Sequence, residues 1–291
     1  MSKLTIESTV TLNNGVEIPR FGLGTWQIRD GRPVRRAIEW ALEAGYRLID
    51  TAAMYGNERG VGQAVKQSGI PREEIFVTTK LWNNDHGYEP ALRAFDESMR
   101  KLGLDYVDLY LIHWPVSGLR AETWRALEEI YEEGRARAIG VSNYTIRHLE
   151  DLLGGAGTAP AANHPSSSGR SPTVPAVNQV EFHPWLYQKD LLDYCVEHDI
   201  LLEAYSPLTK GRRLDNPALR ELAEAYGKSP AQILIRWALQ HDIVVIPKSD
   251  DKEHIQENTD VFDFEISERD MCRLDDLDEN YHCTWDPTSE P

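Results

Sequence analysis

Cysteines and long apolar runs are scarce in this sequence of 291 residues. The three cysteines, Cys195, Cys272 and Cys283, are odd in number and show no C-x-x-C spacing. A disulfide framework or zinc motif is therefore not expected, and we predict reduced thiols, with Cys195 in the core and Cys283 exposed in a polar tail. No apolar run reaches the ~18 residues that a membrane span needs. The N-terminus, MSKLTIESTV, lacks a signal-peptide pattern, so we expect a cytoplasmic protein.

Positive charge is also in short supply. Acidic residues number 47 against 31 basic ones, which gives a net charge of −16. Such a chain has no surplus of cations to neutralise phosphates, so a nucleic acid partner is excluded. Only nine of the basic residues are lysines. Adaptation to salt and a GC-rich genome both produce an acidic, lysine-poor composition, and the sequence does not choose between them.

Short apolar strands alternate with helical stretches eight times along the chain. Alternation of this kind predicts an α/β fold, a (β/α)8 TIM barrel formed by a single domain over residues 1–291. An additional N-terminal β-hairpin is predicted over residues 9–16 by the turn Asn13-Asn14-Gly15, and two extra helices over 216–226 and 267–277. The predicted strands are 21–24, 46–49, 75–79, 106–112, 136–141, 176–180, 201–204 and 243–246, and the predicted intervening helices are 33–44, 57–67, 89–102, 121–133, 146–153, 188–197 and 230–240.

One segment, residues 154–172, is of low complexity. Glycine, alanine, serine and proline dominate it, so it can bury little apolar area. We expect a flexible insertion, and because it joins a helix to the next strand it belongs to the barrel face opposite the catalytic loops.

Polar residues follow three of the predicted strands. Residues 45–58, GYRLIDTAAMYGNE, place Asp50 and Tyr55 just beyond one strand, Lys80 closes a second, and His113 follows a third. Carboxyl ends of parallel strands meet at one face of a barrel, so these side chains are expected in one pocket. A phenol that gives up a proton near neutral pH needs a cation to lower its pKa, and Lys80 is the candidate.

These residues lie in stretches that resemble the aldo-keto reductases. GYRLIDTAAMYGNE is similar to the first signature of that family, KLGLDYVDLYLIHWP at 101–115 to the second, and IPKS at 246–249 to the third. The resemblance runs from GLGTW at 22–26 to TWDPT at 284–288, and the tail resembles bacterial members of the 2,5-diketogluconate reductase and aldehyde reductase type. It implies a hairpin that closes the bottom of the barrel, extra helices after strands seven and eight, and a monomer.

The resemblance also implies an activity, NAD(P)H-dependent reduction of a small-molecule aldehyde or ketone. Tyr55 would act as general acid, Lys80 would stabilise the phenolate and Asp50 would keep Lys80 charged. His113 would orient the carbonyl; family members that reduce steroid double bonds carry glutamate at the matching position. The short tail, residues 280–291, predicts an open pocket, and the natural substrate is not readable.

Further site residues are carried over by the same resemblance. Tyr205 would stack on the nicotinamide, Ser142, Asn143 and Gln179 would bind its carboxamide, and Ser206 and Leu208 would contact the pyrophosphate. The full expected cofactor set is Gly24, Thr25, Trp26, Asp50, Ser142, Asn143, Gln179, Tyr205, Ser206, Leu208, Lys248, Ser249, His254 and Asn258, and the expected substrate set is Trp26, Trp82, His113 and Trp114.

The residues around IPKS bear on the choice of cofactor. Lys248 and Ser249 suit a 2′-phosphate, but His254 stands where NADP-preferring relatives commonly have arginine, and Asp250 and Asp251 crowd the loop. A neutral histidine lacks the bidentate fork of arginine. We therefore expect NADPH to be preferred and NADH to be tolerated, with Arg212 and Arg213 able to compensate in part.

Two other functions remain open from the sequence. One is a nucleotide-binding, redox-sensing regulatory subunit with little turnover, and the other is a phosphate-substrate isomerase on the same fold, for which a glycine-rich phosphate loop is missing. Glu181 and His183 have no partner pattern, so we interpret them as structural or exposed and assign no metal.

Overall fold

The computed structural model describes residues 4–154 and 173–290. Its centre is a ring of eight strands in which each strand pairs in parallel with the next along the chain. Two isolated parallel bridges, Phe21 to Val245 and Gly24 to Lys248, join the first and last strands of the ring. The predicted barrel is confirmed. Its strands are β3 (Gly22–Gly24), β4 (Leu48–Asp50), β5 (Phe76–Leu81), β6 (Val107–Ile112), β7 (Ala136–Ser142), β8 (Val177–Glu181), β9 (Leu201–Tyr205) and β10 (Val244–Val245).

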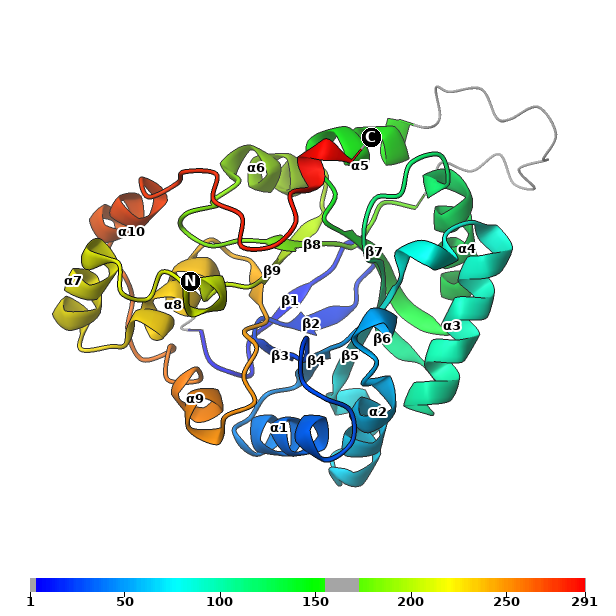
Figure 1. The fold of residues 1–291 in the computed structure, drawn as a ribbon, viewed down its shortest axis with the longest axis horizontal. Coiled ribbons are helices and arrows are strands. Elements are labelled where there is room, and N and C mark those ends of the chain that lie inside the picture. The colour runs from blue at the N-terminus through cyan, green and yellow to red at the C-terminus, as the bar shows by residue number, and fades with distance from the viewer. Residues whose placement is uncertain (1–3, 155–172, 291) are drawn as a thin grey trace.

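Helices surround this ring (Figure 1). The two extra helices predicted from the sequence are present as α7 (Pro217–Tyr226) and α10 (Glu268–Asp275), and the hydroxyl of Ser267 caps α10 as its position before the helix indicates. The other helices are α1 (Arg32–Glu43), α2 (Glu58–Gln67), α3 (Tyr88–Leu102), α4 (Arg120–Glu132), α5 (Ile146–Gly154), α6 (Lys189–Glu197), α8 (Pro230–Gln240) and α9 (Lys252–Glu257). Short 3-10 turns lie at Ala53–Tyr55, Arg72–Glu74, Asn83–Asp85, Thr209–Gly211 and Pro287–Ser289.

The flexible insertion expected at residues 154–172 lies, apart from Gly154, outside the described residues. None of the helices in the described ranges combines the length and the apolar composition needed to cross a bilayer.

The N-terminal hairpin covers one end of the barrel. Strands β1 (Thr9–Thr11) and β2 (Glu17–Pro19) pair antiparallel, with Val10 opposite Ile18. Ile18 and the turn residue Leu12 are buried in a cluster with side chains from the amino-terminal halves of the barrel strands, among them Leu48 and Phe76. The predicted hairpin is therefore confirmed, and its apolar side chains close this end of the barrel.

Alternation along the strands sorts apolar from polar residues inside the barrel. Successive strand side chains point to opposite faces, so residues two apart share a face. The interior-facing side chains next to the hairpin are apolar. On several strands the interior-facing side chains two and four positions later are polar. The apolar layer is Leu48, Phe76, Leu109, Ala138, Val177 and Val244; the positions above it include Asp50, Lys80, His113, Ser142, Gln179, Glu181, Glu203 and Lys248.

Strands β7 and β8 approach closely at Gly140. A Cβ atom at this position would lie 2.4 Å from the carbonyl oxygen of Val177 and 2.9 Å from Leu111 Cδ2. No larger residue fits without moving the backbone of β8, so the glycine sets the spacing of the strands below Ser142 and Gln179.

Candidate active site

A cavity of about 700 Å³ opens at the carboxyl ends of the barrel strands. Most of the residues predicted to form the site line it: Gly24, Trp26, Asp50, Tyr55, Trp82, His113, Trp114, Ser142, Asn143, Gln179, Tyr205, Ser206, Leu208 and Lys248. The sequence interpretation missed the lining residues Gln27, Met54, Pro207, Lys210, Gly211, Leu214, Ile246, Cys283, Thr284 and Trp285. Thr25, Lys80, Ser249, His254 and Asn258 are not among the lining residues.

Lys80 lies beneath the cavity and joins two of the predicted site residues. Its ammonium nitrogen is 2.7 Å from Asp50 Oδ1, 2.9 Å from the carbonyl oxygen of Thr51 and 3.3 Å from the hydroxyl of Tyr55. The Lys80 side chain is fully buried and that of Asp50 nearly so. A buried ammonium needs such partners because an unpaired charge is costly away from water. Lys80 therefore forms an ion pair with Asp50 and at the same time contacts the hydroxyl of Tyr55.

Tyr55 ends the short 3-10 turn Ala53–Tyr55, which Gly56 terminates in a left-handed conformation with φ of 69°. The pKa of Tyr55 is raised well above its usual value by burial, and further by the negative charge of Asp50 and, once it is ionised, of Glu203. The lowered pKa predicted from the sequence is therefore wrong for this state of the protein, since burial outweighs the proximity of Lys80 and Asp50 offsets its charge. Tyr55 holds its proton across the neutral range.

His113 faces the same cavity from the end of β6. Its ring is edge-on to Tyr55 and to Trp82, with centroids 5.6 Å and 5.3 Å away. Burial, and then the charge of Lys80, lowers the pKa of His113 well below its usual value. The ring is therefore neutral at pH 7, with one N–H donor and one acceptor nitrogen.

A second buried carboxyl group, Glu203 on β9, lies below these residues. The side-chain nitrogen of Gln179 is 2.8 Å from both Asp50 Oδ2 and Glu203 Oε2 and donates to each. Burial, together with the charge of Asp50, raises the pKa of Glu203 to about 8, so that it carries a proton at neutral pH. The sequence interpretation missed Glu203. The available signal was an acidic residue inside an apolar strand, on the same strand face as Tyr205.

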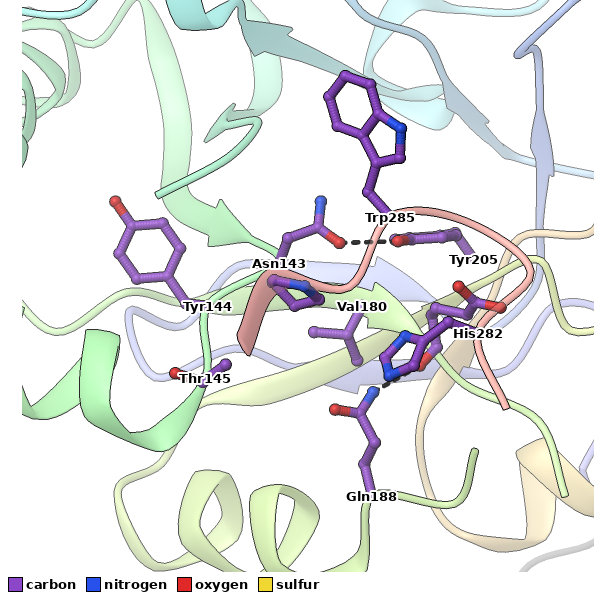
Figure 2. Close-up of a pocket in the computed structure, with 10 residues that line it drawn as sticks. Asn143, Tyr144, Thr145, Val180, Gln188, Tyr205, His282 and Trp285 are labelled. Carbon is purple, nitrogen blue, oxygen red and sulfur yellow. Dashed lines mark hydrogen bonds between the residues drawn. The ribbon is translucent and has the colours of Figure 1, made fainter. Parts of the chain in front are cut away.

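Asn143 connects His113 to Tyr205. Its amide nitrogen donates to the carbonyl oxygen of His113 at 2.9 Å, and the Tyr205 hydroxyl donates to its amide oxygen at 2.7 Å, the contact drawn in Figure 2. Ser142 is held in turn, because its hydroxyl donates to the carbonyl oxygen of Gln179 at 2.8 Å. Asn143 and Ser206 both have left-handed backbone, with φ of 63° and 50°. Strained positions of this kind cluster at functional sites.

The C-terminal tail reaches the cavity. Cys283, Thr284 and Trp285 line it, and the Trp285 ring lies 5.5 Å from that of Trp114 while remaining 65% exposed. Figure 1 shows the tail crossing the ring of strands to end beside α5, where the carbonyl oxygen of Glu290 lies 3.0 Å from His148 Nε2. The short tail therefore forms part of the cavity wall.

Two cysteine predictions meet different outcomes. Cys195 is buried in the core as predicted. Cys283, predicted to be exposed, is only 6% exposed, because the tail packs against the end of β8.

At the far end of the cavity, Lys248 already has an acidic partner. Its ammonium group is 2.7 Å from Asp250 Oδ1. The hydroxyl of Ser249 donates to the carbonyl oxygen of Asp251, and Asn258 is buried at the C-terminal end of α9. His254 has a side chain 70% exposed, 3.9 Å from Asp251.

The arginines expected to help Lys248 are engaged elsewhere. Arg213 pairs with Glu279 and lies over the ring of Tyr281, and a hydrogen bond involving Tyr281 raises the pKa of Arg212. Lys210, which the sequence interpretation did not name, lines the cavity and sits 4.5 Å above the ring of Trp26. Among the residues that the structure describes, Lys210 and Lys248 are the lysine or arginine side chains that line the cavity.

A cavity with titratable side chains at the carboxyl ends of a parallel eight-stranded barrel defines a barrel enzyme. The family model "Aldo/keto reductase family" matches residues 20–279. The chain is 51% identical over 286 residues to an uncharacterized oxidoreductase, YtbE, of Bacillus subtilis (strain 168), covering 97% of each, and 50% identical over 276 residues to the glyoxal reductase of the same organism, covering 95% of each. It is also similar to a crystal structure of a mutant of Gox0644 in complex with NADPH, with 38% identity and a TM-score of 0.85 over 97% of this chain and 98% of that one. The chain belongs to the aldo/keto reductase family.

Proposed function

We propose that the protein reduces an aldehyde or ketone with a nicotinamide cofactor, with Tyr55 as the general acid. The observation that carries this proposal is the position of Lys80, whose ammonium group contacts both Asp50 and the Tyr55 hydroxyl at the floor of the cavity. Membership of an oxidoreductase family and the NADPH complex of Gox0644 support the same reaction.

Tyr55 supplies the proton. Its raised pKa keeps the hydroxyl protonated before the reaction, which is the form that an acid needs. When the proton passes to the oxygen of the substrate, a negative charge appears on the phenol 3.3 Å from Lys80. The ammonium group stabilises that charge, and Asp50 holds the ammonium group in place.

His113 positions the substrate oxygen. Neutral imidazole has one N–H group to donate, and the lowered pKa of His113 keeps the ring in this form. The edge-on contacts with Tyr55 and Trp82 hold the ring beside the phenol. A carbonyl oxygen that accepts from His113 would therefore also be within reach of the Tyr55 proton.

The lining residues fit a nicotinamide cofactor. Tyr205 offers an aromatic face beside Asn143, and the amide nitrogen of Gln179 is committed to two carboxyl groups, which leaves its amide oxygen to accept from a carboxamide. Ser206 and Leu208 line the same cavity as Tyr205 and Lys248, so they are available to a pyrophosphate. When bound, the reduced nicotinamide supplies the hydride, while the protein binds, orients and protonates the substrate.

We further propose that NADPH is preferred and NADH is used. Lys248 lines the cavity where a 2′-phosphate would bind, but Asp250 already pairs with it, and the exposed His254 lacks the bidentate fork of an arginine. The contribution of the 2′-phosphate to NADPH affinity is therefore expected to be small.

The decisive experiment follows NADPH absorbance with a panel of aldehydes for the unmodified protein and Tyr55→Phe. We expect aldehyde-dependent oxidation that falls by a factor of ~10³ or more in Tyr55→Phe, because general acid catalysis contributes ~10²–10⁴-fold. Quenching of tryptophan fluorescence by NADPH should be equal in both proteins. Tight NADPH binding without turnover of any carbonyl compound by the unmodified protein would instead favour a nucleotide-binding regulatory subunit.

A further inference from the structure

Three potential metal ligands meet where the C-terminal tail packs against the end of β8. Within the described ranges, Glu181, His183 and Cys283 offer one carboxylate oxygen, one imidazole nitrogen and one thiol sulfur that all lie within 4.8 Å of one another, and all three residues are buried. Oxygen, nitrogen and sulfur are the ligand types of zinc sites. The sequence interpretation could not find this group because about a hundred residues separate Cys283 from the other two.

The acidic member of the group is ionised. Burial alone would raise the pKa of Glu181, but hydrogen bonds from His183, Cys283 and Thr284 outweigh it and lower the value to about 2. The Nε2 atom of His183 is 2.9 Å from Glu181 Oε1, and the backbone nitrogens of Cys283 and Thr284 lie 2.7 Å and 3.0 Å from the two carboxylate oxygens. In the described part of the chain no side-chain cation pairs with this buried carboxylate apart from His183.

Unpartnered polar atoms surround the group. His183 Nδ1 is buried without a hydrogen-bond partner, and neither ring nitrogen of His282 makes a hydrogen bond, although its Nε2 atom lies 3.7 Å from Asp286 Oδ1. His282 and Glu181 line a cavity of about 10 Å³, which Figure 2 shows with Gln188 and Tyr205 beside it. A cavity of that size holds about one water molecule. Most buried polar atoms in native proteins have a hydrogen-bond partner. The nitrogens that lack one here are therefore free to bind a further ligand.

We propose that Glu181, His183 and Cys283 bind one divalent cation of the zinc type, and that the cation fastens the C-terminal tail to β8. Metal–ligand distances of ~2.0–2.3 Å in a tetrahedral site separate the ligand atoms by about 3.3–3.6 Å. A pair at the outer limit of 4.8 Å would need to approach by about 1.2–1.5 Å, whereas His183 Nε2 and Glu181 Oε1, now 2.9 Å apart, would need to separate by about 0.4 Å. A water molecule would complete the fourth position, as in other zinc sites with three protein ligands.

The charges of such a site balance. The cation takes the place of the proton between His183 Nε2 and Glu181 Oε1, which moves to Nδ1 of the same neutral ring, and of the thiol proton of Cys283, which passes to solvent. The two negative charges of the carboxylate and the thiolate then meet the two positive charges of the cation. Binding therefore releases a proton from Cys283 and strengthens as pH rises.

The site is independent of the proposed reductase reaction but touches its machinery. Thr284, next to Cys283, lies 3.0 Å from the hydroxyl of Tyr205. Lys210, which lines the active-site cavity, donates to the carbonyl oxygen of Cys283 at 3.0 Å. A cation at Cys283 would thus fix the tail segment that forms one wall of the active site.

The test uses full-length protein dialysed against a chelator and titrated with Zn²⁺ by calorimetry and with Co²⁺ by absorbance. We expect one site per chain and a cobalt–thiolate absorption band. Cys283→Ser should remove the band, and both Cys283→Ser and His183→Asn should weaken Zn²⁺ binding by ~100-fold or more, beyond the 10–100-fold cost of losing an outer-shell partner. The matched controls are Cys272→Ser and His254→Gln, which remove an exposed thiol and an exposed imidazole and should change neither result.

Other outcomes overturn the proposal. A thiolate band that disappears in Cys272→Ser would identify an adventitious surface site. Saturable binding that Cys283→Ser and His183→Asn leave unchanged would place the metal elsewhere. The absence of saturable binding to the unmodified, folded protein would show that the group is a hydrogen-bonded latch with no metal affinity. This last measurement decides the matter even if a substituted protein fails to fold.

Discussion

The hydroxyl oxygens of Thr284 and Tyr205 lie 3.0 Å apart and join the C-terminal tail to the active site. Tyr205 has a single hydroxyl proton and also donates to Asn143, so Asn143 and Thr284 compete for it. On its other side the Thr284 hydroxyl donates to Glu181. One threonine therefore contacts both the buried carboxylate that holds the tail and the phenol proposed to support the nicotinamide.

Replacing Thr284 by valine should loosen the tail. The substitution keeps the shape of the side chain but removes its hydroxyl, which bonds to the ionised Glu181. A hydrogen bond to a charged group contributes ~1.5–3 kcal/mol, so we expect the free energy of unfolding in urea to fall by about that amount. Thr288→Val is the control, because its hydroxyl contacts only the partly exposed Asp286, and it should change stability by less than ~0.5 kcal/mol. Equal losses in the two variants would show that Thr284 has no special role.

Glu203 should make the protein less stable as pH rises. Burial, and then the charge of Asp50, raises its pKa from 4.5 to about 8 in the folded state. The folded protein thus binds this proton more tightly than the unfolded chain does, so the contribution is complete below pH ~4.5 and is lost as pH rises through about 8. We expect Glu203→Gln to flatten the stability profile between pH 5 and 8, by an amount on the order of a few kcal/mol.

Denaturant unfolding across that pH range measures the effect. The amide of glutamine can still accept from Gln179, so the substitution removes the titration and retains the contact. Glu197→Gln, at an exposed position on α6, is the control and should leave the slope of unfolding free energy against pH unchanged. A slope that Glu203→Gln also leaves unchanged would mean that Glu203 is not the titrating group.

His254→Arg should increase the preference for NADPH over NADH. An arginine at this exposed position offers a fixed fork of N–H donors for a 2′-phosphate, whereas the imidazole of histidine does not. A charge-assisted hydrogen bond of ~1.5–3 kcal/mol predicts a rise of ~10–100-fold in the ratio of kcat/KM values. For the unmodified protein we expect a ratio below ~10⁴, which corresponds to ~5 kcal/mol. His198→Arg, on an exposed position outside the cavity, is the matched control. A ratio that rises equally in the control would reflect net charge alone.

Trp285→Ala should weaken binding of bulky aromatic aldehydes more than that of small ones. The Trp285 ring lies 5.5 Å from Trp114 at the edge of the cavity, so a flat substrate can pack against both rings. Aromatic pairs contribute ~0.5–1.5 kcal/mol beyond their buried area, and we expect KM for an aromatic aldehyde to rise ~3–10-fold with little change in kcat. KM for a two-carbon or three-carbon aldehyde should change less than twofold. Val196→Ala, which removes an equally exposed apolar side chain that does not line the cavity, is the control.

Local sequence pattern predicted most of the barrel and of its polar centre. Strand positions, the hairpin and both extra helices follow from alternation and turn residues, and parity alone places Asp50, Lys80 and His113 on the interior face of their strands. Local sequence pattern did not predict the contacts that the C-terminal tail makes with the barrel. Trp285 packs against Trp114, just after β6, and Cys283 packs against the end of β8. Both partners lie far away in the sequence, and the polar tail has no hydrophobic periodicity from which these contacts could be predicted. The pKa of Tyr55 was misjudged for a related reason, since burial depends on the assembled barrel and not on neighbours along the chain.

The junction between β3 and β10 is made by isolated bridges, Phe21 to Val245 and Gly24 to Lys248, instead of a continuous ladder. Gly24 and Lys248 also line the active-site cavity. A ligand that spans both residues would therefore hold the two edges of the barrel wall together. Substrate-free protein should open along this seam most readily, and amide hydrogens beside it, such as that of Val245, should exchange with solvent faster than those in the middle of β6. If the proposed cofactor spans this seam, raising its concentration should slow the exchange of these amide hydrogens.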